Sequence, residues 1–309
     1  MTDLTVTFPT QNGPVRACDG VSLDIDAGEV VGLVGESGSG KSVAALAVLG
    51  LLPPLGVVEA GSVRFDGVEL LGAPRSVLRA VRGRQIGLVF QDAARALDPV
   101  HRVGFHLAEA AGGAADGAAL LDRVGLPAEL LRRYPHQLSG GQQQRVMIAC
   151  AIAGRPRLLI ADEPTSSLDS VTQVLVLREL MRIRAQEGCA LLLISHQLGL
   201  VSRVADRVTV MYLGRVMEQT TVAGFTSEAA HPYTVALVAA TPGYRGALRG
   251  RVIPGRPGLL TDVPPGCPFH PRCGLAEPRC RTEWPALRRA PGGGSAMACH
   301  LREPQGVPR

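Results

Sequence analysis

The chain has 309 residues, of which 46% are hydrophobic and 19% charged, a composition typical of globular proteins and unlike that of disordered ones. The formal net charge is +5, but the arginines are scattered and aromatic residues make up only 4% of the chain, which argues against a nucleic-acid-binding protein. The first ten residues lack the parts of a signal peptide. The longest apolar run, residues 43–58, contains Pro53 and Pro54 and is too short to span a membrane, so we expect a cytosolic protein.

The first 225 residues alternate between short apolar runs and segments of helical composition. Buried strands are predicted at residues 29–35, 84–92, 157–164 and 189–196, and a hairpin at residues 207–219. Helices are predicted at residues 42–52, 116–126, 140–153 and 170–188. Strands that alternate with helices predict an α/β core with a mostly parallel sheet.

The composition of the sequence changes after about residue 225. Proline, glycine and arginine become dense, and the apolar periodicity fades. We therefore predict a domain of residues 1–230 followed by an irregular extension of residues 231–309.

The stretch GESGSGKS, residues 35–42, joins the first predicted buried strand to the first predicted helix. Its glycines let backbone N–H groups surround a phosphate group, and the helix N-terminus adds the positive end of its dipole. Lys41 is the only lysine of the chain. Its compact ammonium suits a phosphate cradle better than the planar guanidinium of an arginine, and Ser42 is expected to bind Mg²⁺. The alternative is a glycine-rich turn with this spacing by chance.

The predicted strand at residues 157–164 ends in two adjacent carboxylates. Asp162 is suited to bind Mg²⁺, and Glu163 is suited to orient or deprotonate an attacking water molecule. The alternative is an acidic pair that only closes the strand.

A second glycine-containing stretch, LSGGQQQR at residues 138–145, precedes another helix. Ser139, Gly140 and Gly141 at the start of that helix form a second anion-binding end. Because one nucleotide does not need two such ends from one chain, the second is expected to serve the nucleotide of a neighbouring subunit.

Together these stretches resemble the motifs of the ABC ATPase family. The matches are Walker A at residues 35–42, the Q-loop at Gln91, the signature at residues 138–142, the D-loop at residues 166–169 and the switch histidine at His196, with Asp162 and Glu163 following the intervening strand. The resemblance implies an α/β fold with a RecA-like P-loop core, a helical insertion at about residues 92–149 and an N-terminal antiparallel β part. It also implies a head-to-tail dimer that binds two ATP molecules.

The resemblance assigns roles to individual residues. Catalytic roles fall to Lys41, Gln91, Glu163 and His196, and Mg²⁺ ligation to Ser42, Gln91 and Asp162. Contacts with ATP are implied for Phe8, Gly35, Ser37, Gly38, Gly40, Lys41, Ser42, Val43, Gln91, Asp162, Ser139, Gly140, Gly141 and Gln142. For Phe8, a core aromatic is an equally open interpretation. The sequence departs from the family pattern after Gln91, in DAARALDPV, and at Gln197.

The extension contains HPYTVALVAATP and CPFHPRC, which resemble the C-terminal region of the oligopeptide/dipeptide subfamily of ABC importers. Four of the seven cysteines lie there, at Cys267, Cys273, Cys280 and Cys299. Some members of the subfamily carry a 4Fe-4S cluster in this region, so the resemblance implies such a cluster here. Zinc, or cysteines that only pack, remain open alternatives.

We therefore predict the ATP-hydrolysing subunit of a bacterial ABC importer for di- or oligopeptides. Its partners would be a second ATPase subunit (a paralogue), two membrane permeases and an extracytoplasmic substrate-binding protein, with no nucleic acid. It would lie at the cell membrane, peripheral on the cytoplasmic side. Alternatives are an importer of nickel or another small solute, an exporter ATPase, and a soluble ABC ATPase that acts on DNA or ribosomes.

Overall fold

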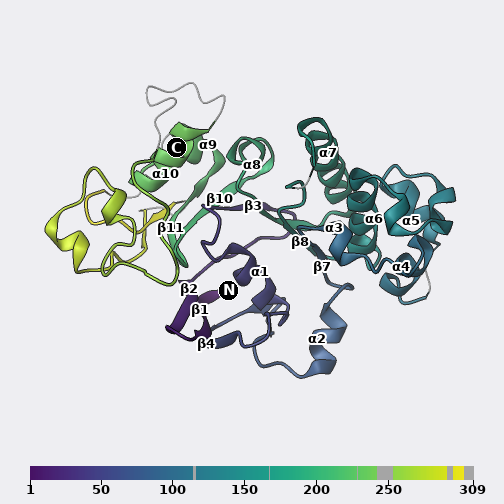
Figure 1. The fold of residues 1–309 in the computed structure, drawn as a ribbon, viewed down its shortest axis with the longest axis horizontal. Coiled ribbons are helices and arrows are strands. Elements are labelled where there is room, and N and C mark those ends of the chain that lie inside the picture. The colour runs from purple at the N-terminus through teal and green to yellow at the C-terminus, as the bar shows by residue number, and fades with distance from the viewer. Residues whose placement is uncertain (114–115, 167, 228, 242–252, 291–294, 303–309) are drawn as a thin grey trace. The chain divides into compact units, whose positions relative to one another are not determined.

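The computed structural model describes residues 1–113, 116–166, 168–227, 229–241, 253–290 and 295–302 (Figure 1). The chain separates into two compact units. The first unit comprises Met1–Asp24, Val31–Ala73 and Ser195–Arg309, and the second comprises Ile25–Val30 and Pro74–Ile194. Each unit is described by itself.

The first unit begins with an antiparallel sheet in the order β2-β1-β4, as the resemblance implied. Its strands are β1 (Thr2–Thr10), β2 (Gly13–Val21) and β4 (Val57–Ser62), and a small hairpin of β5 (Arg64–Phe65) and β6 (Val68–Glu69) follows. Leu4 and Val6 alternate with more exposed residues along β1 and are fully buried, so one face of this sheet packs on the core.

A second sheet of the first unit leads into the predicted phosphate-binding segment. Residues 31–34 of β3 (Val30–Val34) pair in parallel with β10 (Arg207–Tyr212), and β10 forms the predicted hairpin with β11 (Arg215–Thr221). Two short strands of the extension, β13 (Ala296–Met297) and β12 (Arg288–Arg289), continue this sheet beside β11. The helices of this unit are α1 (Lys41–Val48), α8 (Leu198–Val204), α9 (Val222–Ser227) and α10 (Pro232–Ala240).

The second unit contains a parallel sheet in the order β9-β8-β7, with strands β9 (Ala190–Ile194), β8 (Leu158–Asp162) and β7 (Ile86–Val89). All five residues of β9 are buried, as expected for a strand covered on both faces. The helices of this unit are α2 (Arg75–Val81), α3 (Ala93–Ala96), α4 (Val103–Ala110), α5 (Gly117–Arg123), α6 (Gly140–Ile152) and α7 (Ser170–Glu187), with 3₁₀ turns at Ala128–Arg132 and Pro135–Gln137.

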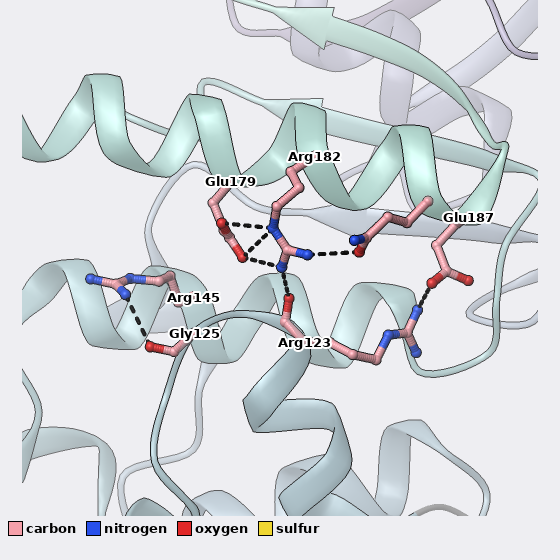
Figure 2. Close-up of polar contacts among 7 residues, drawn as sticks. Arg123, Gly125, Arg145, Glu179, Arg182 and Glu187 are labelled. Carbon is pink, nitrogen blue, oxygen red and sulfur yellow. Dashed lines mark hydrogen bonds and ion pairs between the residues drawn. The ribbon is translucent and has the colours of Figure 1, made fainter.

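Polar contacts tie the end of α5 to α7 (Figure 2). Arg182 of α7 bonds the carboxylate of Glu179 on its own helix, at 3.1 Å from Nε to Oε2, and also the carbonyl oxygen of Arg123. The Arg123 side chain in turn pairs with Glu187 near the end of α7. These bonds join the segment before the signature to the long helix after the D-loop, so the insertion is anchored within its unit.

The predicted buried strands and the hairpin are confirmed, although most are a residue or more shorter than expected. The first helix ends at Val48 and not at residue 52, because Gly50 adopts a left-handed conformation with φ 58° and two prolines follow. Among the described residues, no helix is long and apolar enough to cross a bilayer. The boundary near residue 230 stays a prediction.

Candidate functional site

The phosphate loop of the first unit has the backbone that its glycines predict. Gly35 and Gly40 have φ values of 151° and 96°, and an added Cβ would lie 2.1 Å from the Met211 carbonyl oxygen and 2.0 Å from the Ala17 carbonyl oxygen, respectively. No side chain could occupy either position without moving the backbone. Gly38, with φ 77°, faces open space. The loop is therefore held tightly from behind and remains open at Gly38, which fits a phosphate ligand.

The single lysine lies inside this loop. Lys41 is only 5% exposed, and its Nζ donates to the carbonyl oxygens of Gly35 at 2.9 Å and Glu36 at 2.8 Å, and to the Ser39 hydroxyl at 3.2 Å. Gly40 caps α1 without a side-chain acceptor. Lys41, Ser42 and Val43 thus begin the helix at the open end of the loop, where a nucleotide phosphate would meet the ammonium group and the helix N-terminus.

The loop is also bonded to residues from far along the chain, which the sequence did not predict. The Glu36 carboxylate accepts from the Arg272 guanidinium, at 2.7 Å from Nη1 to Oε2 and 3.0 Å from Nη2 to Oε1. The Glu36 N–H donates to the Tyr233 hydroxyl at 3.0 Å. The sequence contains one sign of this arrangement: an acidic residue within a predicted phosphate-binding loop, whose negative charge a nearby cation would have to neutralise.

In the second unit, the structure brings together two of the predicted catalytic side chains. Glu163 directly follows β8, and its Oε2 accepts from Gln91 Nε2 at 3.1 Å. The Glu163 backbone has φ 44°, an uncommon value for a residue with a side chain, and its N–H donates to the Ile194 carbonyl oxygen at 2.9 Å. Asp162 is the last residue of β8 and pairs with Ile194 of β9. The carboxylates thus emerge at the carboxyl end of a parallel strand, where α/β proteins place ligand-binding groups.

The signature stretch forms the N-terminus of α6. The Ser139 hydroxyl accepts from Gln142 N at 3.3 Å, while Gln142 Oε1 accepts from Ser139 N at 3.0 Å, so the two residues form a capping box. Ser139 and Gly140 are exposed. An added Cβ at Gly141 would lie 2.8 Å from Cγ2 of Thr172 on α7, which explains the glycine there by close packing. The start of this helix is therefore accessible to solvent.

The remaining predicted residues have simpler settings. His196 follows β9 and is exposed. Phe8 on β1 is half-buried and packs against Gly56, where an added Cβ would lie 2.8 Å from the ring. In the D-loop, Asp169 accepts from Val171 N and Thr172 N and so caps α7, while Ser167 lies outside the described residues. Pro242, the last residue of the stretch beginning at His231, also lies outside them.

The four cysteines of the extension line one cavity of about 20 Å³ in the first unit, together with His231, Phe269, His270 and His300. Burial raises the pKa of Cys267 to about 11, and the neighbouring thiols add to this rise. Two histidines of this cavity contact backbone: His270 Nδ1 lies 2.9 Å from the Cys267 carbonyl oxygen, and His300 Nε2 lies 2.9 Å from that of Glu283. Within the described part of the chain, no three His, Cys, Asp or Glu side chains are grouped so as to hold a single metal ion.

Comparison with known families gives two matches. The ABC transporter family matches residues 18–166, and the C-terminal region of oligopeptide/dipeptide transporters matches residues 217–280.

The chain is also similar to named relatives. The dipeptide transport ATP-binding protein DppD of Escherichia coli is 42% identical over 313 residues, which cover 96% of this chain and 94% of the relative. The oligopeptide transport ATP-binding protein OppD of Salmonella typhimurium is 40% identical and covers 94% of this chain and 90% of the relative. OppD of Mycobacterium tuberculosis is 46% identical over 301 residues, but this chain spans only about half of its length, 49%.

Two solved structures resemble the fold. A dimeric ATP-binding cassette in a post-hydrolysis state, bound to ADP and Pi, has a TM-score of 0.64 and 26% identity and covers 72% of this chain and 97% of that chain. A subunit of the Clostridium perfringens cbiONQ ABC transporter complex has a TM-score of 0.62 and 27% identity over 74% of this chain and 91% of its own.

Proposed function

Since this chain belongs to the ATP-binding proteins of the ABC transporter family, with the C-terminal region of the oligopeptide/dipeptide transporters, we propose that it binds and hydrolyses ATP to drive uptake of di- or oligopeptides. The observation that carries the proposal is Glu163 at the end of a buried strand, bonded to the amide of Gln91, in a chain that also contains a complete phosphate loop. The similarity to DppD and OppD supports peptides as the transported class.

In this proposal, different residues of the chain bind the phosphates, take the proton and hold Mg²⁺. Lys41 and the loop N–H groups bind the β- and γ-phosphates. The oxygen of a water molecule attacks the γ-phosphorus, one water proton passes to Glu163, and ADP leaves. Ser42, Asp162 and Gln91 would hold Mg²⁺, which neutralises phosphate charge. The Gln91 amide, 3.1 Å from the Glu163 carboxylate, keeps that carboxylate oriented.

The exposed start of α6 supports a head-to-tail dimer. Ser139, Gly140, Gly141 and Gln142 would contact the nucleotide held by a second ATPase subunit, which we propose is a paralogue. His196 and Phe8 would complete the site on the chain's own nucleotide, as a phosphate contact and an adenine contact.

Apolar side chains near the Q-loop support docking to membrane permeases. Phe90, Val100 and Phe105 are 43%, 72% and 48% exposed, respectively. Large apolar side chains exposed within one stretch of the chain, residues 90–105, support a contact with another protein. We propose two permease subunits there, an extracytoplasmic substrate-binding protein on the other side, and a peripheral position on the cytoplasmic face of the cell membrane.

For the extension we propose a 4Fe-4S cluster held by Cys267, Cys273, Cys280 and Cys299. The four thiols line one cavity, and a cluster binds each thiolate through a different iron atom, so the sulfurs need not surround a single point. The cluster would cross-link the extension; we assign it no electron transfer.

Hydrolysis by the assembled transporter tests the proposed function. Lys41→Ala and Lys41→Arg are both expected to abolish turnover, because neither restores a compact ammonium inside the loop. Arg157→Lys, which adds a lysine at an exposed position, is the control and should retain turnover. Near-normal hydrolysis by Lys41→Arg would contradict the role of the ammonium.

A further inference from the structure

We infer that Arg272 is a positioning residue for the phosphate loop: it neutralises and holds the carboxylate of Glu36 so that the loop can accept a polyphosphate. The inference rests on the proposed nucleotide binding. It links the extension directly to the ATP site, through residues 236 positions apart in the sequence.

The contact is bidentate, and it joins a buried guanidinium to a carboxylate that is partly exposed. Two guanidinium nitrogens of Arg272 each bond one Glu36 oxygen, at 2.7 Å and 3.0 Å, the geometry that gives arginine–carboxylate pairs their strength and direction. Arg272 is only 7% exposed. Its other donors are also occupied, Nε by the Pro254 carbonyl oxygen at 2.9 Å and Nη1 by the Tyr212 hydroxyl at 3.3 Å. The guanidinium is therefore fixed by the protein and available to Glu36 in one orientation.

The charge of Glu36 explains why the loop needs this arginine. Glu36 immediately follows Gly35, and its carbonyl oxygen accepts from Lys41 Nζ at 2.8 Å. An unpaired carboxylate within the loop would repel a nucleotide polyphosphate, and its partial burial strengthens the repulsion. Paired with Arg272, the carboxylate contributes little net charge.

The extension determines where Arg272 lies. Arg272 ends a 3₁₀ turn, His270–Arg272, directly before Cys273, and the turn is held by a bond from His270 N to the Cys267 carbonyl oxygen at 2.9 Å. The Phe269 ring packs against the rings of Tyr212 and Tyr233, with centroids 5.6 Å and 5.1 Å apart. Order around the cysteine cavity thus sets the position of the arginine.

Titration of purified full-length chain with MgADP, followed by calorimetry, tests the inference. Arg272→Gln is expected to weaken binding roughly 10-fold, because loss of a charged hydrogen-bond partner for a carboxylate costs on the order of 1.5–3 kcal/mol and part of it falls on the loop. Glu36→Gln should bind within about three-fold of the unchanged protein. The double variant Arg272→Gln/Glu36→Gln should recover most of the lost affinity, because no unpaired carboxylate remains. Arg281→Gln, at an exposed arginine of the same extension, is the matched control.

The outcomes separate the possibilities. If the unchanged chain binds no MgADP, the proposed function fails and the inference fails with it. If it binds and Arg272→Gln binds equally well, or if the double variant is as weak as Arg272→Gln, the inference alone is overturned. Should Arg272→Gln not fold, Arg272→Met removes the charge and keeps a side chain of similar length, and equal binding by that variant would also overturn the inference. In the assembled transporter, Arg272→Gln should raise KM for ATP by a larger factor than it lowers kcat.

Discussion

Removing one oxygen atom from Tyr233 should loosen the phosphate loop. The Tyr233 hydroxyl accepts the Glu36 N–H at 3.0 Å, and the tyrosine is fully buried. Tyr233→Phe keeps the ring, which packs on Tyr212 with centroids 4.7 Å apart and on Phe269 at 5.1 Å. The substitution therefore removes a hydrogen bond and leaves the packing unchanged.

The size of the effect follows from the burial of the two partners. A neutral hydrogen bond contributes on the order of 0.5–1.5 kcal/mol, and a buried N–H left without an acceptor costs about 1–3 kcal/mol. Because the Glu36 N–H is only partly buried, water can replace part of the lost bond. We expect the free energy of unfolding to fall by about 1.5 kcal/mol.

Two measurements check this expectation. Urea unfolding gives the free energy, and hydrogen exchange of peptides that cover residues 33–40 should show faster exchange at the loop. Tyr134→Phe, which removes the same atom from a half-buried tyrosine of the second unit, is the control for unfolding. Unchanged hydrogen exchange in the loop peptides of Tyr233→Phe would refute the proposal that the Tyr233 hydroxyl stabilises the phosphate loop.

Three further predictions concern the catalytic groups and the cysteines. Glu163→Gln keeps an acceptor for the Gln91 amide but cannot take a proton. ATP hydrolysis by the assembled transporter should therefore fall on the order of 10²–10⁴-fold, while ATP binding persists. Normal turnover would contradict the role of Glu163 as the base. Ser139→Arg should spare nucleotide binding at the chain's own loop and block hydrolysis of the nucleotide held by the partner subunit. Trapped-nucleotide analysis, with each subunit mutated in turn, measures this. A loss confined to the chain's own nucleotide would contradict the head-to-tail dimer. Cys273→Ser should lower the iron content of anaerobically purified protein, which is about four atoms per chain for this cluster type, and should also lower the protease resistance of the extension. The control is Cys150→Ser, at a thiol whose pKa burial raises to about 12, and it should change neither quantity. Purified unchanged protein without iron would exclude the cluster.

The ATP-site motifs could be predicted from the sequence because local rules set their backbone. Strands that end at Val34 and Asp162 are apolar runs stopped by a glycine or a charge, and the loop from Gly35 to Gly40 needs conformations that only glycine adopts readily. The bond between Gln91 and Glu163 follows from two adjacent parallel strands that end at the same edge. Periodicity and turn chemistry are sufficient for such features.

The contacts of the extension could not be predicted in the same way. Its weak periodicity predicts an irregular extension, yet Phe269 and Met297 are almost completely buried, and Met297 packs with Ala230 and Cys299. Met297 becomes buried because β13 joins the sheet beside β11, and Phe269 because its ring packs against Tyr212 and Tyr233. Both are contacts between distant segments that leave no repeat in the sequence. The Arg272 contact is of the same kind, since a single arginine among many shows no local sign of its partner.

The pairing of Glu36 with Arg272 has a consequence for how such ATPases diverge. A related chain with the same loop but no extension has no cation to compensate an acid at the position of Glu36, so selection should favour a neutral residue there. A chain that gains the extension can tolerate the acid, and once both are present the arginine cannot be lost alone without weakening nucleotide binding. We therefore expect lineages that keep the acid to keep the arginine, and the acid to be neutralised before or together with loss of the arginine.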